Sequence, residues 1–461
     1  MPDVRSLGAI VSYDRDVRGS YARDVSGLEM LPEGVARPAA EDEVVEVLRH
    51  SQADRIALTP AGGQTSTTAA SISDRGLILS LRSLDRILDI DPVRRTARAQ
   101  PGVPIAELAA AAAEQGLLFA PDPTSEREAT LGGAVACNAS GARTLLYGPT
   151  RCHVRALRVA HAGGDIAEYR RTYLEKNTVG YALAQNPVDW FIGSEGTLGV
   201  VLEVEVGLLP RPERIVGLTL PFPDEQQALA FVVAVRESEG VHPRCLEFFD
   251  PETAAIFLGD GTTQEGDSGP ALVYTEEALD GDREPDFDSW LELAERFGVL
   301  ADDIQVYDDD AALREARRRR HTVPATMQER GFRHLGDGGR RVSTDWSVPY
   351  RRLGEMVAIG RRLAAEAGVP RPVFFGHAGN GHPHANFIAP DPAAVERVEA
   401  VVAAMLREVV AMGGTVAAEH GIGKIKRKWV GLQLSPRQLG VMRAVKRELD
   451  PLGLMAPGNI L

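Results

Sequence analysis

The sequence predicts an α+β fold in two parts, in which short strands alternate with helices. In the first part, apolar runs of strand length alternate with runs whose apolar residues recur at helical spacing. The Pro-Arg-Pro at 210–212 then stops a strand of alternating apolar residues and marks a boundary. Beyond it, a strand, a helix and a strand at 215–220, 224–239 and 245–249 are typical of a ferredoxin-like α+β unit.

The remaining elements follow from the same patterns. At 41–51 the apolar residues recur at helical spacing, and at 104–115 an alanine-rich helix ends before Gly116. Further strands are predicted at 56–59, 77–81, 96–100, 154–160, 200–209, 303–307, 372–375 and 414–418, and further helices at 287–297, 311–327, 351–367, 392–412 and 436–449.

Composition excludes some classes of function. The 461 residues carry a formal net charge of -14, which disfavours nucleic acid and anionic membrane surfaces as partners. The three cysteines form no C-x-x-C pair, which indicates a reducing compartment. The N-terminus lacks a signal-peptide pattern, and no apolar run reaches ~18 residues. We therefore expect a cytoplasmic protein, with peripheral association with a membrane left open.

Small and hydroxyl-bearing residues gather in three loops of the first part, at 60–68, 121–141 and 193–199. Glycine pairs let a backbone approach a phosphate closely, and successive N–H groups form a nest for an anion. Several such loops in one domain suit a long ligand with two phosphates and flat rings. The sequence contains neither a strict G-x-G-x-x-G nor a P-loop, so this ligand is not held in the Rossmann manner.

These loops resemble those of a known family. The shared motifs are PGV at 101–103, PDPTS at 121–125, the glycines from 132 to 141, YG at 147–148 and GSEGTLG at 193–199. The chain is similar to the vanillyl-alcohol-oxidase / p-cresol-methylhydroxylase superfamily and, within it, to the FAD-linked D-2-hydroxyacid dehydrogenases. That group includes D-lactate dehydrogenase, D-2-hydroxyglutarate dehydrogenase and the glycolate oxidase flavoprotein subunit. The resemblance implies a two-subdomain FAD-binding domain at 1–211, a ferredoxin-like α+β cap at 212–412, and a segment at 413–461 that returns to the FAD domain.

The resemblance also implies which residues hold FAD. The pyrophosphate is expected on Gly62, Gly63, Gln64 and Thr65. The other residues expected to contact the cofactor are Pro60, Pro121, Asp122, Ser125, Gly132, Gly133, Asn138, Ser140, Gly141, Gly196 and Val200. Some members of the superfamily attach the flavin covalently through His or Tyr. Since these loops contain no histidine, we predict non-covalent FAD.

A second constellation lies in the C-terminal half. His377 and His384 flank a glycine-rich reversal, and Glu419 follows a later apolar run. Two histidines and one carboxylate with an open position are the layout of a catalytic divalent-metal site. The family carries Gly-His-x-Gly-Asp-Gly-Asn-x-His and Glu-His-Gly-Ile-Gly in this order. The resemblance therefore implies that His377, His384 and Glu419 bind Zn²⁺ or Mn²⁺, and that His420 is the catalytic base.

This chain departs from the family's pattern at several positions. Asn380 stands where the family has Asp, and His382 stands where it has Asn, so His382 is an additional metal ligand or a group behind the ligands. Near the C-terminus, Ala456 replaces the Asn of the family's Asn-Pro-Gly-Lys. In hydroxyglutarate-type members a Lys stands at the position of Ser343, and its absence disfavours a dicarboxylate of that size.

The substrate implied by the resemblance is a small D-2-hydroxy acid, with a D-lactate-like acid favoured. Its carboxylate needs a cationic clamp, for which Arg320 is the best-aligned arginine, and Asn386 and Lys424 complete the predicted substrate-binding set. The acceptor that reoxidises the flavin, whether quinone, cytochrome or electron-transfer flavoprotein, has no motif, and a homodimer is left open. Three alternatives remain: an electron-relay subunit of a glycolate-oxidase-like complex, a zinc hydrolase, and a metal-free member of the superfamily acting on alcohols or sugars.

Overall fold

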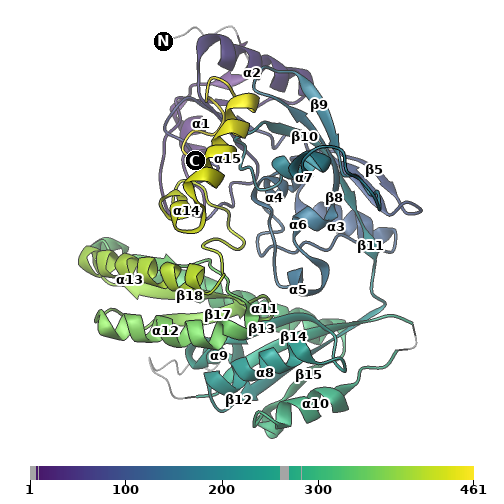
Figure 1. Cartoon of the computed structure of the whole chain (residues 1–461), viewed down its shortest axis with the longest axis vertical. Coiled ribbons are helices and arrows are strands. Elements are labelled where there is room, and N and C mark those ends of the chain that lie inside the picture. Colours follow the sequence, from purple (N-terminus) through teal and green to yellow (C-terminus); the bar gives the residue numbers. More distant parts are fainter. Residues whose placement is uncertain (1–6, 9, 260–268, 282) are drawn as a thin grey trace. The chain divides into compact units, whose positions relative to one another are not determined.

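The computed structural model describes residues 7–8, 10–259, 269–281 and 283–461. Residues 1–6 and 9, which are part of the N-terminal stretch examined for a signal peptide, therefore lie outside the described residues. The chain divides into two compact units, coloured along the sequence in Figure 1. The first unit comprises Met1–Gly141, Gly148–Arg211 and Glu419–Leu461, and the second comprises Ala142–Tyr147 and Pro212–Ala418. The boundary between the units at 211/212 falls within the Pro-Arg-Pro motif, where it is expected. The last boundary lies at 418/419, whereas the sequence predicts it at 412/413.

The first unit opens with a four-stranded sheet of order β1-β2-β4-β3. Strands β2, β4 and β3 run parallel, with β2 and β3 on either side of β4. Parallel strands need a crossover connection, and α2 provides the one from β2 to β3. The apolar face of α2 packs into the core beside β3 and β4. The bounds are β1 (Val11–Ser12), β2 (Gly34–Ala36), α2 (Glu41–Asp54), β3 (Leu58–Ala61) and β4 (Leu77–Ser80).

The first unit also contains a five-stranded antiparallel sheet of order β5-β6-β10-β8-β9 and a two-stranded sheet of β7 (Leu117–Leu118) and β11 (Leu209–Pro210). Helices α3 and α4 supply apolar residues to the core of the five-stranded sheet. The bounds are β5 (Ile87–Asp91), β6 (Thr96–Ala99), α3 (Ile105–Glu114), α4 (Leu131–Cys137), β8 (Val154–Ala160), β9 (Ile166–Arg170) and β10 (Val200–Gly207).

The C-terminal segment belongs to this same unit. Helices α14 (Arg427–Gln433) and α15 (Pro436–Leu449) precede Met455, which bridges to Leu58 of β3. In Figure 1 these yellow helices lie beside the purple N-terminal ribbon of the unit. Two backbone hydrogen bonds of 2.8–2.9 Å link Leu58 to residues 454 and 456, so the chain end extends the first sheet.

The second unit is built on a seven-stranded antiparallel sheet of order β15-β12-β14-β13-β17-β18-β16. Helices α9 and α11 bury apolar residues on one face, with Phe249 and Phe375, while Gly360 of α12 lies against Phe374 on the other. The strands are β12 (Arg214–Phe222), β13 (Pro243–Phe249), β14 (Ala271–Leu279), β15 (Gln305–Tyr307), β16 (Arg340–Ser343), β17 (Val373–His377) and β18 (His382–Ala389). The helices are α8 (Glu225–Glu237), α9 (Pro251–Leu258), α10 (Phe287–Glu295), α11 (Asp310–Phe332), α12 (Leu353–Glu366) and α13 (Pro392–Ala411).

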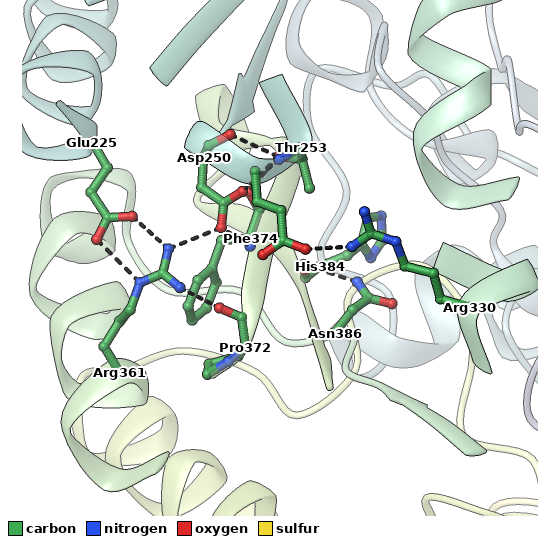
Figure 2. A network of polar contacts seen from close by, with 10 residues as sticks. Glu225, Asp250, Thr253, Arg330, Arg361, Pro372, Phe374, His384 and Asn386 are labelled. Carbon is green, nitrogen blue, oxygen red and sulfur yellow. Dashed lines mark hydrogen bonds and ion pairs between the residues drawn. The ribbon is translucent and has the colours of Figure 1, made fainter. Parts of the chain in front are cut away.

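A buried carboxylate fixes several of these elements to one another. Asp250 caps α9 by accepting from the N–H of Thr253, and it also accepts from the N–H of Phe374 at 2.8 Å. Arg361 of α12 donates to the same carboxylate at 2.9 Å and to Glu225, as Figure 2 shows. The network therefore holds the start of β17 in place, and β17 carries His377.

The predicted α+β class is confirmed, but the predicted strand at 414–418 does not form. That segment makes only one isolated bridge, between Thr415 and Ser347, because its extended backbone runs beside the irregular stretch after β16 rather than beside a strand. Among the residues that the structure describes, no helix is both long and apolar enough to cross a membrane.

Candidate active site

The loop after β3 carries the first predicted cofactor residues. A Cβ atom on Gly62 would lie 2.1 Å from Oγ1 of Thr130, and one on Gly63 would lie 1.9 Å from a backbone carbonyl oxygen. The guanidinium of Arg82 donates to the carbonyl oxygens of Gly62 and Gly63 at 3.0 and 2.8 Å. Because the N–H and C=O of one peptide plane point in opposite directions, the N–H groups of Gly63 and Gln64 point away from Arg82. Two adjacent backbone N–H groups that point away from Arg82 can bind an anion.

Two hydroxyl groups beside this loop fit the predicted cofactor. Oγ1 of Thr59 and Oγ1 of Thr67 are buried and have no hydrogen-bond partner among the described residues. A buried polar atom without a partner costs ~1–3 kcal/mol, which a polar ligand can offset. Together with the two glycines, these hydroxyls fit the pyrophosphate of FAD. Thr59 lies on β3, whereas Thr65 lies with Thr67 on the loop that follows it.

The segment at 121–141 packs its glycines against neighbouring residues. A Cβ atom on Gly132 would lie 2.5 Å from Cβ of Pro101, and one on Gly141 would lie 2.3 Å from the carbonyl oxygen of Asp122. Helix α4 ends at Cys137 and is capped by Asn138, whose φ of 50° is left-handed. The backbone therefore needs these residue types for close packing. The other predicted residues of this segment are Pro121, Ser125 and Gly133.

Two predicted residues farther along lie against or within the core. Gly196 has a left-handed φ of 72°, and a Cβ atom there would lie 3.0 Å from Cδ of Pro60. Val200 begins β10 and is buried in the apolar cluster that also holds Leu58 and Met455. The structure therefore gives Val200 a packing role.

The buried carboxylate of Glu195 organises the turn that follows His420. It accepts hydrogen bonds from the N–H groups of Ile422 and Gly423 at 2.5 and 2.8 Å. A Cβ atom on Gly421 would lie 2.5 Å from Oε1 of Glu195. Burial raises the pKa of Glu195, and the two N–H donors oppose that rise. The bend that the glycines permit after His420 is therefore held by a side chain from the 193–199 loop.

His420 and Glu419 are each tied to a predicted FAD loop. Oγ1 of Thr68 donates to the carbonyl oxygen of His420 at 3.2 Å, and Oγ of Ser140 donates to Oε1 of Glu419 at 3.2 Å. Ser140, predicted to contact the cofactor, thus contacts the predicted metal ligand. The first unit therefore holds the predicted base and the predicted carboxylate ligand beside the loops expected to bind FAD.

Lys424 has partners other than a substrate. Its Nζ donates to the carbonyl oxygen of Ala69 and to Oδ1 of Asn459 at 3.0 and 2.7 Å. The amide of Asn459 donates in turn to the carbonyl oxygens of Ala70 and Glu195. Burial lowers the pKa of Lys424 to about 8. The ammonium thus ties the C-terminal segment to the glycine loop, and a substrate contact of Lys424 stays a prediction.

In the second unit, three histidines share one face of the sheet. In the hairpin of β17 and β18, His377 stands opposite His382, and Phe375 stands opposite His384. Directly opposite residues of an antiparallel pair project from the same face, and so do alternate residues of a strand. The three imidazole ring centroids are 4.7–5.5 Å apart. The glycine-rich reversal therefore brings His377 and His384 together, with His382 beside both.

Glu247 of β13 fixes the ring of His377. Its Oε1 lies 2.6 Å from Nδ1 of His377, and its Oε2 accepts from Nε of Arg320 at 2.6 Å. Burial alone would raise the pKa of Glu247, but Arg320 and His377 lower it to about 2. An ionised carboxylate keeps the histidine proton on Nδ1 and leaves Nε2 as an electron-pair donor, as is common for metal-bound histidine. Arg320, predicted to clamp the substrate carboxylate, is paired with Glu247.

Asp345 and Asn386 extend this row of polar side chains. Nε2 of His382 lies 3.1 Å from Oδ1 of Asp345. Nδ2 of Asn386 donates to the carbonyl oxygen of His384, as the dashed line in Figure 2 shows. Oδ1 of Asn386 is buried and has no hydrogen-bond partner within the described part of the chain. Asn386 can therefore accept a hydrogen bond from a ligand beside the histidines, as the prediction for it requires.

Sequence reasoning did not assign a positioning role to the side chains that hold these groups in place: Arg82, Glu195, Glu247 and Asp345. Glu195 belongs to the GSEGTLG motif, but its partners lie more than 200 residues away in the chain, so no local spacing reveals its role. One usable signal is a charged residue inside an apolar strand, such as Glu247 in the run CLEFF. Such a residue is buried only when it has a partner.

Two protein-family models match the chain. The model described as "FAD linked oxidases, C-terminal domain" matches residues 211–460, and the model described as "FAD binding domain" matches residues 32–170.

Several curated proteins are similar over nearly their whole length. D-lactate dehydrogenase of Anaerostipes hadrus is 31% identical, over 93% of this chain and 89% of that protein. D-2-hydroxyglutarate dehydrogenase of Stutzerimonas stutzeri is 29% identical, over 98% and 96%. Glycolate oxidase subunit GlcD of Bacillus subtilis is 29% identical, over 99% and 93%.

Solved structures share the fold. p-Cresol methylhydroxylase with substrate bound aligns with a TM-score of 0.74 at 16% identity, over 99% of this chain and 95% of that one. An alkyldihydroxyacetonephosphate synthase aligns with a TM-score of 0.73 at 17% identity, over 98% and 84%. At these identities the likeness is one of fold.

Proposed function

The chain belongs to the family of FAD-linked oxidases, and from this premise we propose that it oxidises a D-2-hydroxy acid to the 2-oxo acid with non-covalently bound FAD. The observation that carries the proposal is the row of His377, His382, His384 and Asn386 on one face of the sheet, which offers imidazole and amide groups to a hydroxyl and a carboxylate. Three of these side chains are buried, and His384 is half-buried. Relatives of 29–31% identity are named D-lactate and D-2-hydroxyglutarate dehydrogenases, which supports this substrate class. A D-lactate-like acid is favoured, because Ser343 stands where hydroxyglutarate-type members carry Lys.

In this proposal, FAD when bound supplies the two-electron acceptor for the hydride of substrate C2. His420 takes the hydroxyl proton, which suits a side chain that titrates near neutral pH. Glu195 holds the turn that follows His420. This turn fixes the position of the His420 imidazole before it takes the proton. Asn386 orients the substrate through its open Oδ1, and Arg320 acts as a positioning residue for His377 through Glu247. The two electrons then leave for a quinone, a cytochrome or an electron-transfer flavoprotein.

We also propose a divalent ion, Zn²⁺ or Mn²⁺, as part of this site. The motifs assign it to His377, His384 and Glu419, and nitrogen and carboxylate donors suit both ions. Such an ion would make the substrate hydroxyl more acidic and orient it. The fixed Nδ1–H of His377 supports the assignment, since it leaves Nε2 to donate.

The test is a dye-linked assay of the purified yellow protein against matched D- and L-2-hydroxy acids, with and without added Zn²⁺ or Mn²⁺. We expect reduction of the dye with small D-acids, bleaching of the flavin absorbance by the same acids under anaerobic conditions, and little response to L-acids. A yellow protein whose flavin is bleached by none of these acids would rule the proposal out.

A specific observation favours one of the alternatives, the electron-relay subunit. Glycolate oxidase subunit GlcD, at 29% identity, is named as a subunit, which supports a second candidate, an electron-relay subunit of a larger complex. Turnover by the isolated chain separates the two, because a relay subunit needs its complex. The zinc-hydrolase alternative is set aside, since both matching family models describe flavin-linked domains.

A further inference from the structure

We propose that Arg341 of β16 binds the carboxylate of the 2-hydroxy acid, the role that the sequence predicts for Arg320. The inference rests on the proposed function for the identity of the acid, and it adds the group that recognises the acid's charge. Arg320 is paired with the carboxylate of Glu247 at 2.6 Å, so its charge is already balanced within the protein. A substrate carboxylate therefore needs a second guanidinium group.

Arg341 lies on the face of the sheet that carries the histidine row. It stands directly opposite Ile388 of β18, and directly opposite residues of an antiparallel pair project from the same face. Alternate residues of a strand share a face, so Asn386 and His384 of β18 lie on it too. Asn386 is thus a diagonal neighbour of Arg341, about 7–8 Å away and within reach of a long side chain.

The side chain of Arg341 runs along α11 toward the histidine row. A Cβ atom on Gly331 of α11 would lie 2.7 Å from Cβ of Arg341, whereas Nη1 of Arg341 donates to the carbonyl oxygen of Pro324 at 3.3 Å. The side chain therefore extends from the level of residue 331 toward that of residue 324. Arg320, one helical turn before Pro324, has its Nη2 3.4 Å from Nδ1 of His377. The guanidinium of Arg341 thus points along the helix toward the part of α11 that contacts the site.

Arg341 has no carboxylate partner among the described residues, although it is partly buried. A guanidinium carries five N–H donors, and the bond to Pro324 uses one of them. Burial lowers the pKa of Arg341 below its ordinary value, and no acidic group of the described residues opposes this effect. Three arginines of α11 differ from it, because each pairs with a carboxylate of the same unit. These pairs are Arg317–Glu276, Arg320–Glu247 and Arg330–Glu252.

A guanidinium in this state suits a small organic anion. Burying a charge without a counter-charge costs free energy, which an anionic ligand offsets. The planar guanidinium can donate two parallel hydrogen bonds to one carboxylate. Oδ1 of Asn386 is buried without a hydrogen-bond partner in the described part of the chain, so it can accept from a hydroxyl group. Arg341 and Asn386 together match the carboxylate and the hydroxyl of a 2-hydroxy acid.

The experiment titrates the oxidised, FAD-loaded protein with pyruvate and with pyruvamide, its uncharged counterpart, and follows the flavin absorbance. Neither compound has a hydrogen on C2, so binding is measured without turnover. We expect the wild type to bind pyruvate at least ~10-fold more tightly than pyruvamide. Arg341→Gln should raise the Kd for pyruvate ~30-fold and leave the Kd for pyruvamide within about threefold of wild type. Arg341→Lys, which keeps the charge but not the planar fork, should raise the Kd for pyruvate less.

The matched control is Arg340→Gln. Arg340 is the neighbouring residue on the opposite face of β16, is exposed, and pairs with Glu399 at 2.6 Å. This variant should bind both compounds like wild type. In the dye-linked assay with D-lactate, Arg341→Gln should raise KM with little change in kcat, the result of losing an interaction made equally in the ground state and the transition state.

A structural role for Arg341, in which it only holds α11 on β16 through Pro324, predicts a different result. Arg341→Gln would then unfold at a lower temperature and bind both compounds more weakly by the same factor, and that outcome would overturn the inference. So would equal affinity of the wild type for pyruvate and pyruvamide. If Arg341→Gln does not fold, Arg341→Lys decides, because only a carboxylate contact weakens pyruvate binding alone. Discrimination between the two compounds by a protein that oxidises no D-2-hydroxy acid would refute the proposed function and retain the carboxylate site.

Discussion

Glu195 and Gly423 are joined by a hydrogen bond of 2.8 Å between the side-chain carboxylate of the first and the backbone N–H of the second. The neighbouring N–H of Ile422 donates to the same carboxylate at 2.5 Å. Glu195 is 5% exposed, so water has little access to replace these bonds. Through them, one residue of a glycine-rich loop fixes the turn directly after His420, the proposed base.

Substituting Glu195 is therefore expected to lower turnover without removing the cofactor. Glu195→Gln should reduce kcat about tenfold and change KM little, because the imidazole of His420 is displaced from its productive position. Gly421→Ala should act alike, since its Cβ would lie 2.5 Å from Oε1 of Glu195. The double variant should show non-additive losses, because both changes disturb one contact. Steady-state kinetics across pH and flavin absorbance check this.

The control for this prediction is Glu168→Gln, an exposed carboxylate on β9 of the same unit. It should leave kcat, its pH profile and the flavin spectrum unchanged. The positioning role of Glu195 fails if kcat stays within twofold of wild type in both the Glu195→Gln and the Gly421→Ala proteins.

His420→Ala is expected to retain FAD and to lose ~10²–10⁴-fold in kcat, the usual contribution of a general base. His50→Ala on α2, whose Nδ1 contacts only a helix carbonyl among the contacts of the described residues, serves as the control and should turn over normally. Near-normal turnover of His420→Ala would show that His420 is not the general base.

A buried ion network in the second unit predicts sensitivity to acid. Glu276 accepts from Arg244 at 2.9 Å and from Arg317 at 2.6 and 2.8 Å. Burial favours the neutral acid, but the two guanidinium groups hold the pKa of Glu276 well below its ordinary value of 4.5. The unfolded chain therefore binds more protons in acid, so this stabilisation is complete above about pH 4.5 and is lost as the pH falls below it.

Glu276→Gln should accordingly cost ~3–5 kcal/mol of unfolding free energy at neutral pH, because it leaves two guanidinium groups without a counter-charge. Its stability should also fall less steeply than that of wild type between pH 5 and pH 3, as measured by urea unfolding at each pH. Glu315→Gln, on the surface of α11, removes an exposed ion pair and should change stability little. Parallel pH dependences in wild type and Glu276→Gln would contradict the assignment.

Substitution of Ala456 by glycine is expected to stabilise the protein. Ala456 is buried and has a left-handed φ of 43°, a conformation that costs an L-residue roughly 1–2 kcal/mol. Ala456→Gly removes that strain but adds freedom to the unfolded chain, for a net gain of ~0.5 kcal/mol. Ala110→Gly, exposed within α3, should instead lose ~1 kcal/mol. Chemical denaturation of both variants tests the opposite signs, and destabilisation by Ala456→Gly would show that its Cβ contributes more by packing.

The sequence could predict those features of the site whose signal lies in residues close together in the chain. The glycine loops and the histidine hairpin were predictable, because Gly62, Gly63 and the reversal between His377 and His384 depend on residues close in the chain. The groups that fix them were not, because Glu247 meets His377 and Glu195 meets Gly423 only once distant segments pair. The same long-range pairing assigns Lys424 to Asn459 and Arg320 to Glu247, partners that no spacing rule contains.

Arg82 is expected to contribute to FAD binding without touching the cofactor, by holding the glycine loop. Its guanidinium holds the carbonyl oxygens of Gly62 and Gly63 at 3.0 and 2.8 Å, which turns the following N–H groups toward the opposite side. Because Arg82 is exposed, we expect Arg82→Gln to weaken the Kd for FAD only about tenfold, equal to ~1.4 kcal/mol. Gly63→Ala should lose much more, since its Cβ would lie 1.9 Å from a carbonyl oxygen.

Both effects are measured by titrating deflavinated protein with FAD and following the quenching of flavin fluorescence. Arg94→Gln, another exposed arginine of the first unit, is the matched control and should bind FAD like wild type. Binding of FAD by Arg82→Gln at wild-type affinity would mean that the glycine loop keeps its shape without the guanidinium. Binding of FAD by Gly63→Ala at wild-type affinity would place the pyrophosphate elsewhere, because the loop cannot keep this path with a Cβ atom at that position.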